Sequence, residues 1–305
     1  MTKINYHSRK IISSLYEGRF SDEYDYLYSW KKRLSQELPF FQRLIKKYSP
    51  KTALDCGCGN GFHLALLAQL SSLREITGFD GSAHMLEKAS SNLALLHEKS
   101  IVLTKGNFQD FSKKLTQTYD LITCMYSLTS LSSEKEVISV LKQLKGRLSI
   151  RGRLVIDDLN GDRIVLHKPP PETKQMEAPE YFLLQRNSLE VRISDTPYFA
   201  IQQMSQKIIV RMGNSHLYKW LRRRHVSMTI FTRMGRFVSG DYIFFFPGIL
   251  RRPSITHHKL KLLILTKNIL ARCLKKAGFT RITFYGDYNE STYSTRSFNQ
   301  LIVAQ

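Results

Sequence analysis

The stretch LDCGCGNG, residues 54–61, sets three alternate glycines directly after a short apolar segment. The residues up to Cys56 predict a strand, and FHLALLAQLSS after Gly61 predicts an apolar helix. Glycines between a strand and a helix let the backbone turn sharply and approach a ligand closely. In a doubly wound sheet such a ligand lies beyond the carboxyl ends of the strands. The stretch therefore predicts a binding loop, whose ligand is a metal ion, a nucleotide phosphate or a nucleoside cofactor.

The cysteines of the stretch do not indicate a metal site. A structural zinc site needs about four Cys or His ligands in paired clusters. No second CxxC and no HxxxH accompanies Cys56 and Cys58, and the other two cysteines, Cys124 and Cys273, are isolated. We therefore predict no metal at this loop.

The residues around the glycines also argue against a phosphate-binding loop. A Walker loop needs Lys and Ser or Thr after its last glycine, where this chain has Phe62 and His63. The carboxylate of Asp55 would repel a pyrophosphate, but it suits a ligand that brings an ammonium group. S-adenosylmethionine has no phosphate and carries both an ammonium and a sulfonium. The charge pattern therefore favours S-adenosylmethionine over a dinucleotide.

A second acid strengthens this prediction. Asp80 ends the next predicted strand, where an acidic side chain can accept hydrogen bonds from both hydroxyls of a ribose. Either aspartate alone is an ordinary residue at a strand end. Together with the glycines and the order of the elements, they predict a nucleoside site.

Composition predicts a globular protein. The chain has 305 residues, of which 42% are hydrophobic, enough for one large core or a core with a subdomain. No run reaches the roughly 18 apolar residues of a membrane-spanning helix, and the N-terminus lacks the apolar region of a secretory signal. Four cysteines in a chain of this size predict reduced thiols. We expect a cytoplasmic protein without a membrane span, and the sequence gives no sign of an oligomeric state.

Positive charge is concentrated in the second half of the chain. The net charge is +21, from 46 Lys and Arg against 25 Asp and Glu. Residues 51–160 carry 13 basic and 11 acidic residues, whereas residues 196–286 carry 17 basic residues and one acid, Asp241. Such a field attracts anions, among them small carboxylated or phosphorylated molecules and nucleic acid. Composition bias and solubility are the alternative explanation.

Alternating elements predict the α/β class. Apolar strands separated by helices are typical of a parallel sheet covered on both faces. Strands are expected at 51–57, 74–80, 100–106, 119–126 and 151–160, with helices at 82–97 and 133–149. A helix pair broken near Pro39 is expected over 22–48. The close of the chain predicts a strand at 257–265, a helix at 267–277 with Thr266 as N-cap and Gly278 after it, and strands at 280–286 and 298–304.

Between residue 160 and residue 257 the alternation of strands and helices stops. Residues 167–180 are Pro-rich and are expected to form a connection, and four β-rich segments follow at 181–193, 198–212, 216–232 and 235–246. They predict an antiparallel insert after the fifth strand. The expected organisation is an N-terminal helical cap (1–48), a cofactor-binding core (49–160), a basic β insert (161–256) and the C-terminal part of the core (257–305).

These motifs resemble those of the class I S-adenosylmethionine-dependent methyltransferases. LDCGCGNG is similar to the first motif of that family, TGFD to the second, GNFQDF to the third, YDLITCMYSL to the fourth and RGRLVIDDLN to the strand after it. The resemblance covers residues 50–160, and it returns at the ending from LARCLKKAGFTRITF to RSFNQLIVAQ. The N-terminal YD helix, the β insert and the HH strand are also similar to the glycine/sarcosine and sugar N-methyltransferase branch.

The resemblance implies a doubly wound, Rossmann-like sheet of seven strands, mostly parallel with an antiparallel last strand, and S-adenosyl-L-methionine as the cofactor. It also assigns roles to residues. Asp55, Gly57 and Gly59 are expected to contact the methionine end of the cofactor, and Asp80 its ribose. Asn107 and Phe108 are expected to contact the adenine, and Met125 the region of the sulfonium. Trp30 and Arg33 are expected to contact the cofactor carboxylate. Asn107 stands where the family often has Asp, and it can still accept a hydrogen bond from the adenine amino group.

No motif assigns the catalytic residue. An amine acceptor needs only to be deprotonated, whereas a hydroxyl needs a general base. The candidates for a base are Tyr126, His225 and His257. A metal-assisted transfer would want carboxylates at the ends of both late strands, but the fourth ends in CMY, so none is expected.

The methyl acceptor is open at this stage. A small, anionic molecule methylated at an amine or hydroxyl is the first hypothesis. The second is RNA, because the segment YKWLRRRHV (218–226) sets aromatic residues beside three arginines. The third is a binding module without turnover, since a fold alone does not establish chemistry.

Overall fold

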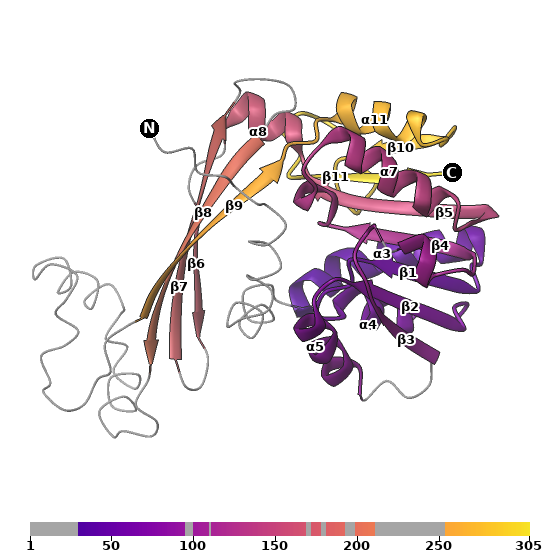
Figure 1. The fold of residues 1–305 in the computed structure, drawn as a ribbon, viewed down its shortest axis with the longest axis horizontal. Coiled ribbons are helices and arrows are strands. Elements are labelled where there is room, and N and C mark those ends of the chain that lie inside the picture. Colours follow the sequence, from indigo (N-terminus) through magenta and orange to yellow (C-terminus); the bar gives the residue numbers. More distant parts are fainter. Residues whose placement is uncertain are drawn as a thin grey trace, which may run out of the picture. The chain divides into compact units, whose positions relative to one another are not determined.

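Strand β1 (Thr52–Cys56), which ends inside the LDCGCGNG stretch, lies in the interior of a seven-stranded sheet (Figure 1). The strand order is β10-β11-β5-β4-β1-β2-β3. Strands β1 to β5 are parallel, and β11 runs antiparallel to both of its neighbours. This confirms the predicted fold class. The other strands of this sheet are β2 (Glu75–Asp80), β3 (Ser100–Lys105), β4 (Tyr119–Met125), β5 (Leu148–Leu159), β10 (Ile282–Tyr285) and β11 (Asn299–Ala304).

The computed structural model describes residues 30–94, 100–109, 111–168, 172–177, 181–192, 199–210 and 254–305, without the side chains of 30–32 and 172–261. A second, four-stranded sheet has the order β6-β7-β8-β9. By its contacts the chain divides into two units: residues 1–170, 189–202 and 259–305 in one, and 171–188 and 203–258 in the other. The strands of the second sheet are β6 (Glu172–Glu177), β7 (Tyr181–Arg192), β8 (Phe199–Val210) and β9 (Ser254–Leu263).

The second sheet corrects two predictions. The Pro-rich stretch expected to be a connection contains β6, which pairs antiparallel with β7. The strand expected at 257–265 is observed as β9, and it belongs to the four-stranded sheet rather than to the seven-stranded one. The strands predicted at 216–232 and 235–246 lie outside the described residues.

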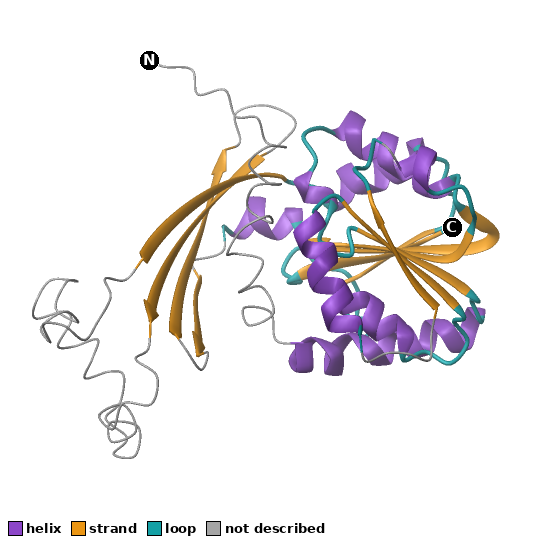
Figure 2. Ribbon diagram, turned by 60° about the horizontal axis from the view of Figure 1, so that its bottom comes forward, coloured by secondary structure: helices purple, strands orange, loops and turns teal. Residues whose placement is uncertain are grey.

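Helices cover both faces of the seven-stranded sheet (Figure 2), because its central strands are apolar on both sides. Leu54 faces α7 and α11, whereas its neighbour Ala53 faces α3 and α4. Leu154 and Val155 divide in the same way, as the two-residue period of a strand requires. The helices are α3 (Trp30–Tyr48), α4 (Phe62–Ala68), α5 (Ala83–Leu93), α6 (Phe111–Lys114), α7 (Glu134–Lys145), α8 (Gly161–His167) and α11 (Lys267–Lys276).

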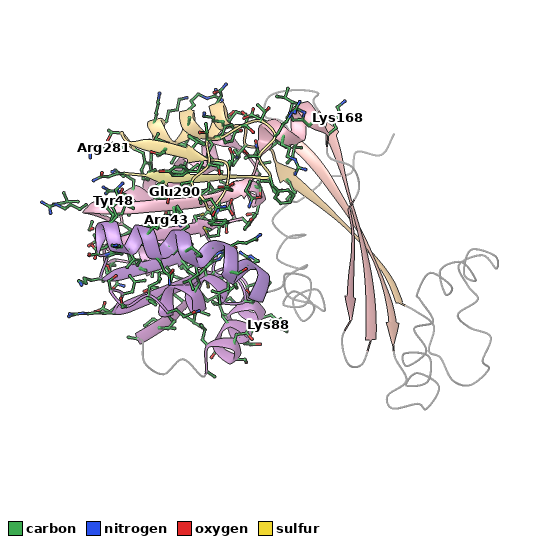
Figure 3. All side chains as sticks on the ribbon, turned by 180° about the vertical axis from the view of Figure 1, so that it is seen from behind. Arg43, Tyr48, Lys88, Lys168, Arg281 and Glu290 are labelled. Atoms are coloured by element: carbon green, nitrogen blue, oxygen red, sulfur yellow. The ribbon has the colours of Figure 1, made fainter. Side chains whose placement is uncertain are left out.

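The prediction of a helix pair broken near Pro39 is wrong for the described part, because α3 continues through the proline. Proline removes one backbone donor, and the burial of Phe40, Phe41 and Leu44 stabilises the helix beyond it. Arg43 ties this half of α3 to the C-terminal loop. Its guanidinium donates to Glu290 (2.8 Å) and to the carbonyl of Tyr288 (2.6 Å), and Arg43 and Glu290 are labelled in Figure 3.

The ends of α11 form as the sequence predicts. The hydroxyl of Thr266 accepts a hydrogen bond from the backbone N–H of Ile269, which makes Thr266 the N-cap. Gly278 follows the helix with φ of +95°, a conformation that favours glycine. Both signals are local, so they do not depend on which sheet the preceding strand joins.

Gly161 brings the start of α8 against the start of α11. A Cβ atom on Gly161 would lie 2.4 Å from the backbone carbonyl of Leu265. Asp162 adds a hydrogen bond across this junction, because its carboxylate accepts the N–H of Lys267 (3.1 Å). The residues after β5, Gly161 and Asp162, are therefore in direct contact with the residues at the start of α11, Leu265 to Lys267.

Replacing Gly161 by alanine is expected to lower the free energy of unfolding by about 1–3 kcal/mol, because the methyl group would overlap backbone atoms of Leu265. Gly146 offers a matched control: it caps α7 in a right-handed helical conformation, and the nearest atom to an added Cβ is 3.5 Å away. G146A should change stability by less than about 1 kcal/mol. Urea unfolding followed by circular dichroism measures both, and equal stabilities would contradict the close approach.

Candidate functional site

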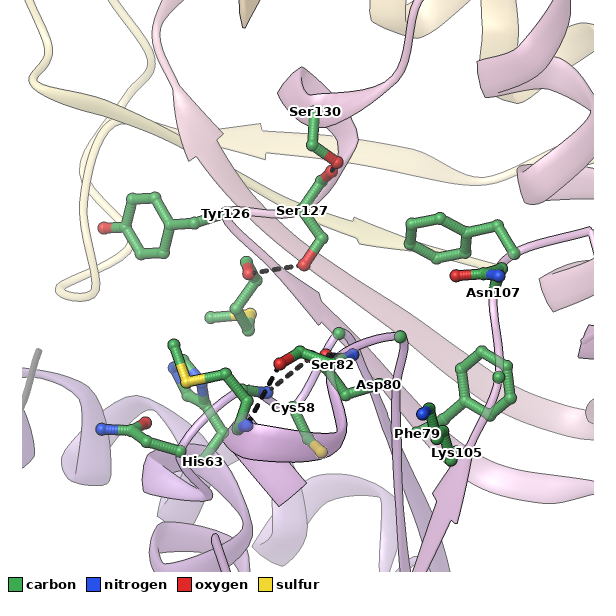
Figure 4. A pocket seen from close by; sticks show the side chains of 18 of the residues that line it. Cys58, His63, Phe79, Asp80, Ser82, Lys105, Asn107, Tyr126, Ser127 and Ser130 are labelled. Carbon is green, nitrogen blue, oxygen red and sulfur yellow. Dashed lines mark hydrogen bonds between the residues drawn. The ribbon is translucent and has the colours of Figure 1, made fainter. Parts of the chain in front are cut away.

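A cavity of about 720 Å³ lies at the carboxyl ends of β1 to β4, as the doubly wound topology predicts (Figure 4). The loops after these four strands form most of its wall, α4 contributes Phe62 and His63, and α3, α5 and α7 contribute one residue each. The predicted site residues on the wall are Arg33, Gly57, Gly59, Asp80, Asn107, Phe108, Met125 and Tyr126. The topology thus gathers residues from motifs that are far apart in the sequence.

The glycine loop presents bare backbone to this cavity. Gly57 and Gly59 have φ of +84° and +52°, which a residue with a Cβ rarely adopts. A Cβ on Gly57 would meet the hydroxyl of Ser127 at 2.2 Å, so this glycine allows the loop after β4 to pack against it. Among the described residues, apart from the two chain neighbours of Gly59, no atom lies within 4 Å of a Cβ placed on it. Since Gly59 lines the cavity, this open space is where a ligand can approach the backbone.

Asp80 holds the glycine loop against the end of β2. One carboxylate oxygen accepts the backbone N–H of Gly59 (2.9 Å), and the other accepts that of Ser82 (2.8 Å). Burial raises the pKa of Asp80, and these backbone donors oppose the shift. The side chain also lines the cavity, so a carboxylate stands between the first two motifs.

Asp55 lies in the sheet beside the loop and is not part of the cavity wall. It is fully buried, and the hydroxyl of Thr123 donates to its Oδ1 atom (2.7 Å). Its Oδ2 atom has no hydrogen-bond partner among the described residues. Burial raises the pKa of Asp55, and the nearby His63 opposes this. The predicted contact of Asp55 with a cofactor stays a prediction.

The wall after β3 carries the residues predicted to meet adenine. Asn107 and Phe108 both line the cavity. A Cβ on Gly81 would lie 2.8 Å from the Oδ1 atom of Asn107, so the loops after β2 and β3 approach each other closely here. Met125, at the end of β4, is buried and lines the cavity from the opposite loop.

Three charged or titratable side chains interact where α3 meets α4. The guanidinium of Arg33 donates to Glu37 (2.9 Å), and His63 lies 2.9 Å from the other oxygen of the same carboxylate. Glu37 is only 2% exposed; burial would raise its pKa, but His63 and Arg33 outweigh burial and the pKa is lowered. Arg33 also stacks 4.1 Å from the ring of Phe62. Sequence reasoning missed Glu37 and His63, although the four-residue spacing of Arg33 and Glu37 is a recognisable helix pair.

A second polar cluster lies behind Tyr126. This residue has a positive φ of +54°, which is uncommon for a bulky side chain, and its ring lines the cavity. The amide of Asn299 donates to the hydroxyl of Tyr126 and also to Asp157 (3.0 Å). The hydroxyl of Tyr288 donates to the same oxygen of Asp157 at 2.5 Å. Tyr288 and Asn299 carry no motif, and no signal in the sequence links them to Tyr126.

Besides Asp55, three predicted residues are not placed at the cavity. Trp30 is the first residue of α3, and its side chain is not described. His257 lies on β9, of which the backbone alone is described. His225 and the segment 218–226 lie outside the described residues. Within the described ranges, no group of three or more His, Cys, Asp or Glu side chains could hold a metal ion. In the same part of the chain, no helix is long and apolar enough to cross a membrane.

Comparison with known proteins identifies the family. The methyltransferase domain family matches residues 48–223, more than half of the chain. The glycine/sarcosine/dimethylglycine N-methyltransferase of Actinopolyspora halophila is 33% identical over 151 residues, which are 49% of this chain and 26% of that protein. The tRNA U34 carboxymethyltransferase of Helicobacter pylori (strain J99) is 31% identical over 121 residues, 38% of this chain and 44% of that one. The chain thus spans about a quarter to a half of the length of these relatives.

Solved structures share the fold. A S-adenosylmethionine-dependent methyltransferase from Clostridium acetobutylicum superposes with a TM-score of 0.65 and 14% identity, covering 94% of this chain and 97% of that one. At this identity the likeness speaks for the fold alone. The family match and the fold agree with the motifs at the glycine loop. The chain belongs to the methyltransferase domain family, and the predicted resemblance to the class I S-adenosylmethionine-dependent methyltransferases is confirmed.

Proposed function

We propose that this chain is an S-adenosylmethionine-dependent methyltransferase that methylates a small, anionic molecule at an amine or hydroxyl. The observation that carries the proposal is the cavity wall, which joins an open glycine backbone at Gly59 to the carboxylate of Asp80 and to the Asn107–Phe108 loop. Its volume of about 720 Å³ is typical of a small-molecule site.

The residues of the wall fit the cofactor. Gly57 and Gly59 would hold the methionine end. The Oδ2 atom of Asp55, which has no hydrogen-bond partner in the described part of the chain, is a buried acceptor beside them for a cationic group. Asp80 would accept the ribose hydroxyls. Asn107 and Phe108 would contact the edge and face of the adenine, and Met125 would lie near the sulfonium. Arg33 on the wall, with Trp30 at the start of the same helix, would face the cofactor carboxylate.

When bound, the cofactor supplies an electrophilic methyl group on a positively charged sulfur. The protein then has to align the nucleophile with that group and keep water away. Buried residues, among them Cys58 and Phe62, lie at the glycine loop, and the ring of Tyr126 forms one wall of the cavity. Tyr126, His225 and His257 remain the candidates for a base.

The relatives favour an amine as the acceptor. The Actinopolyspora protein is named for methylating glycine, sarcosine and dimethylglycine, which are carboxylated amines. Two cations, Arg33 and Lys105, and two carboxylates, Asp80 and Glu136, line the cavity, so support for an anionic acceptor comes from the carboxylated amines in the name of this relative and not from the charge of the wall. The tRNA-modifying relative and the basic stretch 196–286 support RNA as the second candidate.

Isothermal titration calorimetry with S-adenosylmethionine tests the cofactor assignment. D80A is expected to weaken binding by about tenfold to a hundredfold, because it removes charge-assisted hydrogen bonds to the ribose. D120A is the matched control. Asp120 lies near the amino end of β4, where it accepts the N–H of Lys51 (2.9 Å), and it is not on the cavity wall. Equal affinities for D80A and the wild type would contradict the assignment.

A transfer assay with tritiated S-adenosylmethionine tests the acceptor class. Cell extract is divided into small-molecule, RNA and protein fractions, with glycine and sarcosine assayed beside them. Label is expected in the small-molecule fraction. Label in RNA that falls steeply with salt would support the second candidate. Cofactor binding without label in any fraction would indicate a binding module that has lost turnover.

A further inference from the structure

Tyr126 connects the cavity to a buried carboxylate. The residue is 38% exposed and lines the cavity, whereas Asp157 next to it on the sheet is fully buried. The backbone N–H of Tyr126 donates to the carbonyl of Asp157 (2.7 Å), which helps to hold Tyr126 in its positive-φ conformation. Strained residues of this kind cluster at functional sites.

The hydrogen bonds of this cluster leave one route open for a proton. Tyr288 and Asn299 both donate to the Oδ2 atom of Asp157, and its Oδ1 atom has no partner among the described residues. The second N–H of the Asn299 amide donates to the oxygen of Tyr126. The hydroxyl proton of Tyr126 is therefore left to donate, and the Asn299 amide, which donates to both groups, holds this hydroxyl beside the Asp157 carboxylate.

The charges around the cluster suit a proton acceptor that works at neutral pH. Burial raises the pKa of Asp157 to about 7; Glu37 on α3 and the adjacent Asp158 add to the rise, and the Tyr288 and Tyr126 hydroxyls oppose it. Part of the Tyr126 side chain is exposed to the cavity, but burial around its hydroxyl raises the pKa of Tyr126; Asp157 raises it further, and Arg33 opposes the rise. Tyr126 thus keeps its proton and can exchange it, while Asp157 can hold an extra one.

The position of Tyr126 in the cavity assigns this cluster to the acceptor. Tyr126 and Asn107 lie at opposite ends of the cavity, with Asp80 between them (Figure 4). In the proposed function the Asn107 end holds the adenine. The Tyr126 end is then where the wall can contact the molecule to be methylated.

Building on the proposed function, we propose that Tyr126 and Asp157 form a relay that removes a proton from the ammonium group of the acceptor. The N–H proton of the ammonium passes to the Tyr126 oxygen as the Tyr126 hydroxyl proton passes to the Asp157 carboxylate. The acceptor is left as a neutral amine and Asp157 as a neutral acid. The lone pair of the amine then forms the new N–C bond as the C–S bond breaks and its electron pair stays on sulfur. Asp157 later returns its proton to solvent.

The test is the pH dependence of kcat/KM, with the small-molecule fraction of cell extract as the acceptor. Since Asp157 must be ionised, activity is expected to fall below about pH 7, about tenfold per pH unit. In D157N the acid limb should disappear and the rate should fall by about a hundredfold to ten-thousandfold. Y126F should show a similar fall in rate. Y288F removes a donor to the ionised carboxylate, so its acid limb should move to higher pH.

D158N is the matched control. Asp158 is equally buried, and its pKa is also raised to about 7 by burial, but it accepts the backbone N–H groups of Leu159 and Thr129. D158N should keep the acid limb and move it slightly to lower pH, because a like charge beside Asp157 is lost. A limb that disappears in D158N and persists in D157N would overturn the relay.

A second readout does not need an acceptor. The ¹³C resonance of the Asp157 carboxyl, assigned by its absence in D157N, should titrate at about pH 7 in the wild type and higher in Y288F. A resonance that titrates at the ordinary value of an aspartate, about 4, would overturn the relay. A folded wild type that labels no acceptor would overturn the proposed function instead, and the titration would still decide whether Asp157 exchanges a proton at neutral pH.

Discussion

The carboxylate of Asp80 is the interaction on which the site depends. It accepts one backbone N–H from the glycine loop and another from the start of α5, so it joins the first two motifs into one surface. A loop of alternate glycines has high conformational freedom, and a buried acceptor that binds its backbone restricts that freedom. The open space at Gly59 persists because the loop is held at both sides: Asp80 binds Gly59, and Ser127 packs against Gly57. The cavity is thus defined before any ligand enters it.

The period of the sheet explains where the polar residues gather. Asp55, Thr123 and Asp157 point to the same face as Ala53, Leu121 and Val155, the face covered by α3 and α4. Each stands close to the carboxyl end of its strand, where apolar packing gives way to the cavity. Buried carboxylates at such positions are costly unless they are hydrogen-bonded, and Thr123, Tyr288 and Asn299 provide those bonds. The chain therefore maintains a polar row along one edge of an otherwise apolar core.

The parts that the sequence could predict are those with local causes. The glycine loop, the acidic end of β2 and the Thr266 cap follow from neighbouring residues, and the strands follow from their apolar runs. The errors have non-local causes. Whether a helix continues through Pro39 depends on what its later turns bury, and the sheet that β9 joins depends on partners distant in sequence. Tyr288 and Asn299 reach Asp157 across 131 and 142 positions, so no spacing rule could have found them.

The contact between Gly161 and Leu265 closes the chain on itself at one point. Everything between these two residues begins and ends at the same place on the seven-stranded unit. A long loop whose ends meet adds little entropic cost as it lengthens. The intervening stretch could therefore be exchanged for one of different length or composition while the strands that carry the cavity stay joined. Such a junction allows the sequence between Gly161 and Leu265 to diverge without a change in the residues that line the cavity.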